Sequence, residues 1–405
     1  MANILGINLS ELNQSEVLEK ITDFLNGDRQ HYIVTPNPEI LLASNKDEEF
    51  FYILNKADLA LADGFGLKIA GWLFGVNIPR VTGSDTTIEI LKIAAKNGTK
   101  VMILNWEKGL SQPNDIKTAL ENKFPGLIFS ILNISRDKFL SDEAVEKINQ
   151  FAPVILFNTL GFPYQEKLMY HNIKRLPAVK VALGIGGSFD FITGKTRRAP
   201  KIFRSLGLEW LWRLIISFFG KNSRQRIKRI YQATLVFIWQ IIKGRFIYPL
   251  FYRKNVACFL YKKNGEKFEV LIVERTDQPG HWQLPQGGTD NESLEVAGLR
   301  ELQEELGTDK IIIRATFKNV YRYKFKNEDK HTIIKSRQYI FNHKGQSQGL
   351  LVAEFTGNDN DIKINFWDHR NWKWIETDKL IATVHQYRKD GCEKFLEKFQ
   401  SLNLK

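Results

Sequence analysis

Apolar runs alternate with amphipathic stretches throughout the first two hundred residues. Short runs rich in Val, Ile and Leu, bounded by polar or glycine-rich segments, are typical of buried strands, and the stretches between them carry apolar residues at helical spacing. The strand-like runs are HYIVT at 31–35, KVMILN at 100–105, PVILFNTLG at 153–161 and VKVALGIGG at 179–187, and helical patterns lie at 85–96 and 144–151. This alternation predicts an α/β domain with a mainly parallel, Rossmann-like sheet whose strand ends carry the site.

A second series of strand and helix patterns follows further along the chain. Its elements are strands from Val256 and at 269–273, a helix from Glu295 and a final amphipathic helix at 389–399. A chain of 405 residues exceeds what one hydrophobic core usually supports, so two or more domains are expected. The predicted divisions are an α/β domain at 1–195, a basic helical appendage and linker at 196–253 and a second domain at 254–405.

The formal net charge of +13 is concentrated in the predicted appendage. Residues 195–254 hold fifteen Lys or Arg and one acid, Glu209, so this segment carries +14 and the rest of the chain −1. Its longest uncharged stretch, 230–242, has thirteen residues, short of the roughly 20 that a membrane-spanning helix needs. Apolar residues recur at helical spacing there: Ile227, Ile230, Tyr231, Thr234, Leu235, Ile238 and Ile242.

A basic amphipathic segment of this kind fits a helix lying in the interface of an anionic membrane, with its cations at the headgroups and its Trp and Phe side chains at the acyl boundary. A second interpretation is a helical hairpin that packs on its own domain or on another subunit of a homo-oligomer. A third is nucleic-acid binding, which the dense apolar face disfavours.

The low number of cysteines argues against a disulfide framework and fits a reducing cellular compartment. Cys258 and Cys392 are the two cysteines of the chain, and the N-terminus shows no pattern of a secretory signal. We therefore expect a cytoplasmic protein, attached peripherally to the inner face of the cell membrane.

Polar or glycine-rich loops follow several of the predicted strands. They are TPNPE at 35–39, ADGFG at 62–66, GFPYQE at 161–166 and GIGGSFDF at 184–191. Together, in this order, they resemble the TagA/WecG/CpsF family of bacterial glycosyltransferases, over roughly residues 1–245 and including RAP and LGLEWL within 198–211. The resemblance implies inverting transfer of N-acetylmannosamine from a UDP donor to a polyprenyl-diphosphate-linked acceptor, with no essential metal, in surface-glycan or teichoic acid synthesis. It also implies that the basic segment docks on the membrane.

The same resemblance suggests roles for individual residues. Asp63 would take the proton from the acceptor hydroxyl. The polar residues of the sugar and acceptor pocket would be Thr35, Asn37 and Gln165. The leaving UDP would be stabilised by loop amides around Gly184, Gly186 and Gly187, or by Arg213, Arg224 or Arg226. Tyr164 stands where relatives commonly have a basic residue, which leaves the donor sugar open.

Three glutamates on one predicted helix carry the chemistry of the second domain. Glu301, Glu304 and Glu305 fall at i, i+3 and i+4 and so share a helix face. Hard divalent ions such as Mg²⁺ take carboxylate ligands and bridge them to phosphates, so these residues are candidate metal ligands after the Gly287-Gly288 loop. The alternative is a solvent-exposed acidic helix.

The context of these glutamates resembles the Nudix box of hydrolases that act on nucleoside diphosphate derivatives, including the branch that cleaves dinucleoside polyphosphates or processes RNA 5′ ends. Glu292, Arg300 and Gly307 stand at the box positions, with Arg300 and Glu292 expected to brace the loop against the helix. The loop from Gly287 to Glu292 is one residue shorter than the family pattern. The resemblance implies an α/β/α sandwich and a Mg²⁺ or Mn²⁺ cofactor.

A water nucleophile would also need a base. Asp368 stands at the matching distance before Trp372-Lys373-Trp374, where the family has a glutamate. We therefore predict a bifunctional enzyme, a glycosyltransferase joined to a metal-dependent Nudix hydrolase of a nucleoside-diphosphate-linked substrate. The alternatives for the second domain are a weakly active nucleotide sensor or docking module, and a processor of RNA 5′ ends.

Overall fold

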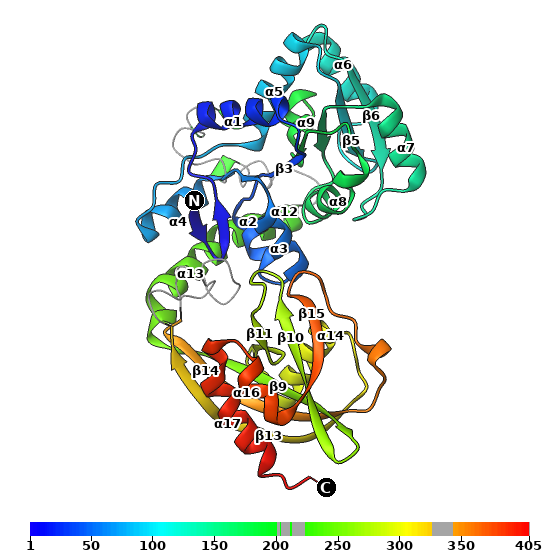
Figure 1. The fold of residues 1–405 in the computed structure, drawn as a ribbon. Coiled ribbons are helices and arrows are strands. Elements are labelled where there is room, and N and C mark those ends of the chain that lie inside the picture. The colour runs from blue at the N-terminus through cyan, green and yellow to red at the C-terminus, as the bar shows by residue number, and fades with distance from the viewer. Residues whose placement is uncertain (201–202, 204–210, 213–222, 326–342, 405) are drawn as a thin grey trace. The chain divides into compact units, whose positions relative to one another are not determined.

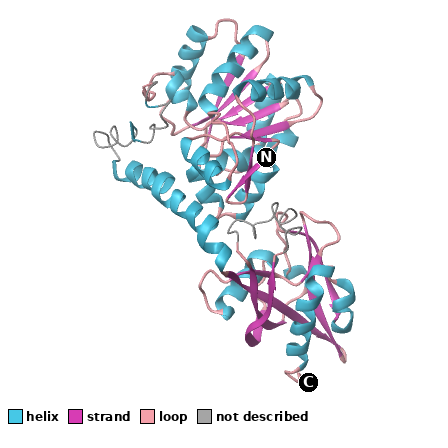
Figure 2. Ribbon diagram, turned by 90° about the vertical axis from the view of Figure 1, so that its left-hand side faces the viewer, coloured by secondary structure: helices cyan, strands magenta, loops and turns pink. Residues whose placement is uncertain are grey.

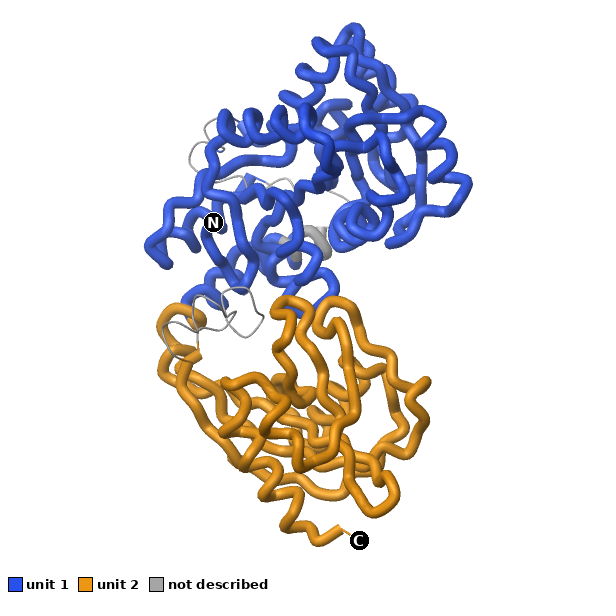
Figure 3. Tube along the Cα trace, viewed as in Figure 1, with its two compact units in different colours: residues 1–242 blue, residues 243–405 orange. Residues whose placement is uncertain are grey.

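The computed structural model describes residues 1–200, 203, 211–212, 223–325 and 343–404 (Figure 1). The chain divides into two compact units, Met1–Ile242 (unit 1) and Lys243–Lys405 (unit 2) (Figure 3). Each unit has its own sheet and its own buried apolar core.

Unit 1 is built on a six-stranded parallel sheet with the order β4-β3-β8-β7-β5-β6. The strands are β3 (His31–Val34), β4 (Leu59–Ala60), β5 (Val101–Trp106), β6 (Phe129–Ile134), β7 (Ile155–Asn158) and β8 (Val181–Gly184). An antiparallel hairpin, β1 (Ala2–Ile4) and β2 (Ile7–Leu9), forms a separate small sheet. The predicted α/β domain with a parallel sheet is confirmed. Strands β3 and β8 are distant in sequence but adjacent in the sheet, so their carboxyl ends meet.

Helices connect these strands and cover the sheet. They are α1 (Gln14–Asn26), α2 (Pro38–Ser44), α3 (Glu48–Lys56), α4 (Phe65–Phe74), α5 (Gly83–Asn97), α6 (Pro113–Lys123), α7 (Asp142–Phe151), α8 (Tyr164–Asn172), the 3₁₀ turn η1 (Ile173–Arg175) and α9 (Ser188–Ile192). Apolar residues of α1, α5, α6 and α9 form one core with alternate strand residues such as Ile33, Ile103 and Phe157. This is the period-2 burial expected of one sheet face.

The basic appendage includes a helical run that contains a π-helical turn. The run comprises α12 (Ser223–Tyr231), the π turn η2 (Gln232–Val236) and α13 (Phe237–Ile242). Phe237 and Ile241 are buried where α13 packs against α2 and α4, whereas Tyr231, Leu235 and Trp239 are exposed. A π turn carries one residue more than an α-helical turn and so rotates the next helical turns about the axis. The predicted face containing Tyr231 and Leu235 is therefore not the face that unit 1 buries.

Among the residues that the structure describes, no helix combines the length and the apolar character that crossing a membrane requires.

Unit 2 contains a seven-stranded mixed sheet. Its strands are β9 (Tyr252–Asn264), β10 (Lys267–Arg275), β11 (Trp282–Gln283), β12 (Gln286–Gly288), β13 (Ile311–Lys324), β14 (Gly345–Phe355) and β15 (His369–Glu376). The main path runs β11-β10-β9-β14-β13, with β12 paired to β9 and β15 to β10. The β9–β14 pair is parallel and the other pairs are antiparallel. The remaining elements are η3 (Lys243–Ile247), η4 (Tyr248–Leu250), α14 (Leu294–Leu306), η6 (Asp359–Asp361), η7 (Thr377–Lys379), α16 (Leu380–Thr383), η8 (Gln386–Arg388) and α17 (Lys389–Gln400).

Apolar cores lie on both faces of this sheet, whose strands are drawn in magenta in Figure 2. Along β9, Val256, Cys258 and Leu260 pack towards α14, while Ala257 and Phe259 pack towards α16 and α17. The predicted helix–sheet–helix sandwich is confirmed. The continuous buried run of β9 follows from the sheet being covered on both sides.

Local sequence explains the bounds of α14. The Ser293 side chain accepts a hydrogen bond from the Val296 N–H at 3.3 Å and caps the first turn. Gly307 ends the helix with φ of 64° and donates its N–H to the Gln303 carbonyl, a left-handed cap that glycine adopts without strain. The helix therefore begins and ends so that the three glutamates lie in its last two turns.

Candidate active sites

The carboxyl edge of the parallel sheet in unit 1 gathers most of the residues predicted for glycosyl transfer. Thr35 follows β3 directly, Asp63 lies shortly after β4, Gln165 is the second residue of α8, which follows β7, and Gly184 ends β8. Ligands of open α/β sheets bind at this edge. The topology therefore gathers residues from four separate loops at one edge of the sheet.

Asp63 is held at the N-terminus of a long helix. Its Oδ2 accepts a hydrogen bond from the N–H of Gly83, the first residue of α5, at 3.2 Å. The positive end of the helix dipole favours the ionised carboxylate, the form that can accept a proton. Gly83 packs on Thr35, because a Cβ added at Gly83 would lie 3.0 Å from Thr35 Cγ2.

Thr35 and Gln165 both bind the end of β8. The buried Thr35 hydroxyl donates to the Gly184 carbonyl at 3.0 Å. Gln165, also buried, accepts the Gly186 N–H on its Oε1 at 3.0 Å. A Cβ added at Gly184 would lie 2.9 Å from Gln165 Nε2, so this position requires glycine. Gly186 is left-handed, with φ of 49°, which leaves the turn after β8 dependent on a second glycine.

The other predicted residues of unit 1 make local contacts of their own or lie outside the described residues. Asn37 caps α2, its Oδ1 accepting the Ile40 N–H at 3.0 Å. Gly187 precedes α9 and packs on the Asp190 carboxylate. Arg224 is exposed on α12, whereas Arg213 and the side chain of Arg226 are outside what the structure describes.

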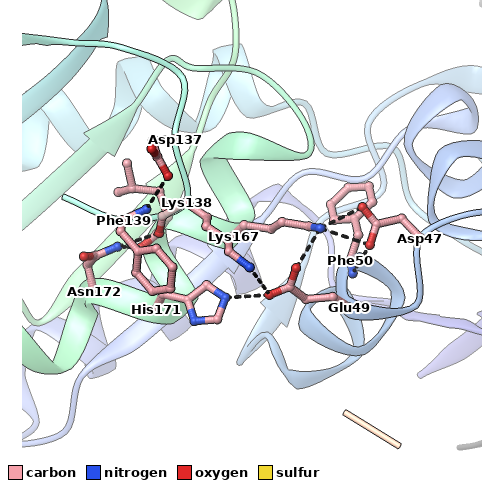
Figure 4. Close-up of polar contacts among 10 residues, drawn as sticks. Asp47, Glu49, Phe50, Asp137, Lys138, Phe139, Lys167, His171 and Asn172 are labelled. Carbon is pink, nitrogen blue, oxygen red and sulfur yellow. Dashed lines mark hydrogen bonds and ion pairs between the residues drawn. The ribbon is translucent and has the colours of Figure 1, made fainter. Parts of the chain in front are cut away.

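A cluster of charged side chains joins α3 to α8, the helix that begins beside Gln165. Figure 4 shows Lys167 of α8 between Asp47 and Glu49, at 2.7 Å and 2.8 Å, and His171 Nε2 2.7 Å from Glu49 Oε1. Burial alone would raise the pKa of Glu49, but the bonds from Lys167 and His171 outweigh it and lower that pKa. The cluster fixes α8 against α3 and so holds the start of α8 in place.

In unit 2, Arg300 links the glycine loop to the glutamate helix. Its Nε lies 3.0 Å from Glu292 Oε2, and its Nη2 donates to the Gly288 carbonyl at 2.7 Å. Its Nη1 reaches Glu301 at 2.7 Å and Glu304 at 3.2 Å. The guanidinium therefore stands between two of the predicted metal ligands as well as bracing the loop.

The third glutamate faces the strand that follows Asp368. Glu305 is buried, accepts the Gln286 N–H at 3.3 Å and lies 3.2 Å from His369 Nε2. Burial lowers the pKa of His369, but the negative charge of Glu305 outweighs it and raises that pKa. Asp368 is held by Asn365, whose Nδ2 lies 3.3 Å from Asp368 Oδ2.

Burial disfavours charge on all three glutamates, and repulsion from neighbouring carboxylates adds to it. Burial, followed by repulsion from Glu305, raises the pKa of Glu301 to about 8 against the opposing effect of Arg300. Burial also raises the pKa of Glu304 and of Glu305, and the nearby Asp368 adds to both shifts. Carboxylates held together in this way are the ligands that hard divalent cations prefer.

The donor set therefore fits such a cation, and the residues that would hold it are Glu301, Glu304 and Glu305. In the conformation described, no three Asp, Glu, His or Cys side chains of the described ranges are arranged to hold a metal ion. Glu301 and Glu304 instead bind Arg300. Metal binding would require Glu304, which is exposed at the surface, to turn from Arg300.

The shortened loop after the double glycine closes through two left-handed residues. Asp290 and Asn291 have φ of 45° and 70°, a conformation that Asp and Asn tolerate better than most residues. The Glu292 N–H then bonds to the Thr289 carbonyl at 2.7 Å. A compact turn thus brings Glu292 to Arg300 although the loop lacks a residue.

Comparison with known proteins identifies both units. The sequence profile described as the Glycosyl transferase WecG/TagA/CpsF family matches residues 2–249, more than half of the chain. The chain belongs to the WecG/TagA/CpsF glycosyltransferase family. The NUDIX domain profile matches residues 251–397. Both predicted resemblances are confirmed: this WecG/TagA/CpsF glycosyltransferase carries a Nudix hydrolase domain.

Curated relatives match the transferase part. Two are the N-acetylglucosaminyldiphosphoundecaprenol N-acetyl-beta-D-mannosaminyltransferases of Staphylococcus aureus strains MRSA252 and NCTC 8325 / PS 47. Each is 30% identical over 247 residues, which cover 60% of this chain and 92% of the relative.

Solved structures match the Nudix part. A C. elegans Ap4A hydrolase binary complex is 23% identical, with 37% of this chain and 98% of that chain covered and a TM-score of 0.28. The E. coli dihydroneopterin triphosphate pyrophosphohydrolase is 18% identical, with 36% and 99% covered and a TM-score of 0.28.

Two features of this WecG/TagA/CpsF glycosyltransferase were missed by sequence reasoning. The first is the cluster of Asp47, Glu49, Lys167 and His171. Its outermost members, Asp47 and His171, are 124 positions apart in the sequence. The second is Glu166, which directly follows Gln165 and is fully buried. A single sequence shows no signal for the first, because charged residues at helical spacing usually face solvent. Glu166 lies in the GFPYQE segment next to Gln165, and nothing in that segment of the sequence indicates that its side chain is buried.

The double glycine of the Nudix unit leads to a stability prediction. A Cβ added at Gly287 would lie 1.8 Å from Glu301 Oε2, and the Glu301 side chain is buried. We expect Gly287→Ala to lower the free energy of unfolding of unit 2 by about 1–3 kcal/mol, the usual range for overpacking. Denaturant unfolding measures this. Gly244→Ala is the control, because an added Cβ there meets nothing within 4 Å, and equal midpoints for the two variants would contradict the prediction.

Proposed function

We propose that unit 1 transfers N-acetylmannosamine, or a related sugar, from its UDP derivative to a polyprenyl-diphosphate-linked acceptor in surface-glycan synthesis. The observation that carries the proposal is the position of Asp63, on the α5 N-terminus and at the strand edge that also holds Thr35, Gln165 and Gly184. The activity that the names of the Staphylococcus aureus relatives state supports it, because the match covers 92% of their length.

The proposed chemistry is a single displacement. The acceptor hydroxyl oxygen attacks the anomeric carbon, the bond from that carbon to UDP breaks, and Asp63 takes the hydroxyl proton. Attack from the side opposite the leaving group inverts the anomeric centre. The Gly184–Gly187 turn and arginines of the appendage are proposed to stabilise the negative charge that grows on UDP.

The direct test is an assay of UDP release. The purified full chain would be mixed with UDP-N-acetylmannosamine and polyprenyl-diphosphate-linked N-acetylglucosamine. We expect UDP release that depends on the lipid-linked acceptor and yields a disaccharide lipid. Acceptor-independent release, or none with any UDP-sugar, would refute the proposed transfer.

Unit 2 is proposed to hydrolyse a nucleoside-diphosphate-linked substrate with Mg²⁺ or Mn²⁺ held by Glu301, Glu304 and Glu305. The bound cation would supply charge stabilisation for the phosphates and activate water. Asp368 is the proposed base, supported by its proximity to the acidic cluster, where its charge raises the pKa of Glu304 and Glu305. Arg300 and Glu292 would hold the loop against the metal helix.

A second function for unit 2, a nucleotide sensor with little turnover, is favoured by one observation. Glu301 and Glu304 both bind Arg300 in the conformation described, so a cation must compete with a guanidinium. A screen of the full chain with Mg²⁺ against dinucleoside polyphosphates, nucleotide sugars and 5′-triphosphate RNA separates the two. Turnover of any of them supports the hydrolase, whereas tight nucleotide binding without turnover supports the sensor.

The appendage is proposed to dock on an anionic membrane surface, where the lipid-linked acceptor lies. Tyr231, Leu235 and Trp239 follow at intervals of four residues and are 54%, 64% and 50% exposed, while Arg224 and Lys228 are exposed on the same helical run. Large apolar side chains beside cations suit the headgroup–acyl boundary. The buried face with Phe237 and Ile241 leaves this stripe outward.

Vesicle binding tests this docking. We expect the double variant Leu235→Ser and Trp239→Ser to lose roughly tenfold or more in affinity for anionic vesicles, because each large apolar side chain contributes about 1.5–3 kcal/mol on burial. Co-sedimentation measures the affinity. Leu110→Ser is the control, since Leu110 is comparably exposed, at 56%, in the loop between β5 and α6. Unchanged binding of the double variant, or release of vesicles by excess RNA, would contradict the proposal.

A further inference from the structure

Glu166 is a buried acid in unit 1 that the proposed displacement does not use. Its side chain is fully inaccessible at the start of α8. Its Oε1 accepts a hydrogen bond from Gln165 Nε2 at 2.7 Å, and its Oε2 has no hydrogen-bond partner among the described residues. Burying a carboxyl group without a counter-charge is unfavourable, and packing alone would be served by an apolar residue.

The hydrogen bond from Gln165 decides how the Gln165 amide is oriented. The Glu166 carboxyl oxygen accepts the hydrogen bond from Gln165 Nε2. In this orientation of the amide, Gln165 Oε1 accepts the N–H of Gly186 at 3.0 Å. Gly184 packs directly on the same amide. An amide turned the other way would set its Nε2 against the Gly186 N–H, two donors facing each other, and its Oε1 against the carboxyl oxygen.

The contacts of Gln165 continue to the proposed base. Gly184, which lies on Gln165, accepts the Thr35 hydroxyl at 3.0 Å. Thr35 packs on Gly83, whose N–H donates to Asp63 Oδ2. Glu166 is therefore the buried end of a continuous set of contacts that runs through Gln165, Gly184 and Thr35 to the helix end that holds Asp63.

We propose that Glu166 is a positioning residue of the transferase site: its carboxyl oxygen fixes the Gln165 amide, and this amide holds the Gly184–Gly187 turn against which the donor diphosphate lies. The inference rests on the function proposed for unit 1. Glu166 touches neither donor nor acceptor in this role, and it acts through Gln165.

Glu166→Gln and Glu166→Leu separate this role from packing. Glutamine keeps an acceptor oxygen for Gln165, so kcat/KM stays within about threefold of the native value. Leucine removes the acceptor and leaves a buried Nε2 unpaired, so kcat/KM falls by roughly tenfold or more. Glu166 acts through Gln165, so its substitution should matter little once Gln165 is replaced. We therefore expect the double variant Gln165→Leu/Glu166→Leu to have nearly the same kcat/KM as Gln165→Leu alone. Additive losses, or equal activity of the Leu and Gln variants at temperatures where both are folded, would overturn the role.

Stability against pH gives a readout that needs no transfer. Burial raises the pKa of Glu166 to about 7, opposed by the Gln165 hydrogen bond and the residue's own N–H, and no charged side chain of the described residues contributes. A carboxyl with a raised pKa stabilises the fold fully below its unfolded pKa, and that stability is lost as pH rises to about 7. We expect the native chain to lose stability relative to Glu166→Gln across this window. Parallel curves would show that Glu166 is not held in this buried environment.

UDP binding distinguishes failure of this inference from failure of the proposed transfer. Calorimetry with UDP should show weaker binding to Glu166→Leu than to Glu166→Gln or the native chain, whether or not any acceptor is used. A native chain that binds UDP without transferring sugar would refute the transfer alone. Native-like UDP affinity in Glu166→Leu would refute the positioning role alone.

Discussion

Asp63→Asn is expected to lower kcat for glycosyl transfer by at least about a hundredfold, the lower end of what a positioned general base contributes. Asparagine is the same size and keeps an oxygen that can accept the Gly83 N–H, so the loop after β4 and the start of α5 should stay in place. The amide cannot take a proton from the acceptor hydroxyl near neutral pH. Acceptor-dependent UDP release measures the loss.

The signature of a lost base is a fall in kcat with little change in the KM for the donor. Asp142→Asn serves as the control, because Asp142 is a fully exposed aspartate on α7, paired with Arg175. It should transfer sugar as the native chain does. Transfer by Asp63→Asn at the native rate would assign the base elsewhere, and a loss accompanied by unfolding would leave Asp63 with a structural role.

The fold could be predicted from sequence where burial is periodic. The runs at 31–35, 100–105, 153–161 and 179–187 each overlap a strand of the parallel sheet, and the helical pattern from Glu295 overlaps α14. Short elements were harder, because the β1–β2 hairpin has only three residues in each strand. The exposed face of the appendage was hard to predict for a different reason: helical spacing assumes a constant turn, and the π turn Gln232–Val236 breaks it.

The site could be predicted as far as its motifs are local. Glu301, Glu304 and Glu305 share a face because one helix carries them, and Arg300 reaches Glu292 across a short loop. Sequence alone did not indicate that Arg300 also stands between Glu301 and Glu304, because the torsions of long side chains are decided by tertiary neighbours. The same limit applies to Glu166, whose significance lies in burial and in a single bond to Gln165.

These same Arg300 contacts make Glu304 the informative residue for the Nudix half. Glu304 is the exposed member of the three glutamates, so replacing it disturbs the core of unit 2 least. Glutamine keeps an oxygen for Arg300 Nη1 but gives up the negative charge that a hard cation prefers. Residues that merely support metal ligands typically account for 10–100-fold in affinity or activity, so a direct ligand should account for at least about tenfold.

Glu304→Gln is therefore expected to lower Mg²⁺-dependent hydrolysis of dinucleoside polyphosphates by more than about tenfold and to raise the Mg²⁺ concentration needed for half-maximal rate. Phosphate-release kinetics across a Mg²⁺ titration measure both effects. Glu295→Gln is the matched control. Glu295 is exposed in the first turn of the same helix and precedes Arg300, whereas the three glutamates follow it. Loss in both variants would point to the helix rather than the metal. The native chain and Glu304→Gln could instead bind nucleotide equally well, with no hydrolysis by the native chain. That result would mean that Arg300 keeps Glu301 and Glu304 from the metal and that unit 2 acts as a nucleotide sensor. Recovery of rate at high Mg²⁺ would instead show that Glu304 contributes to metal binding, because a loss of metal affinity is offset by mass action of the metal.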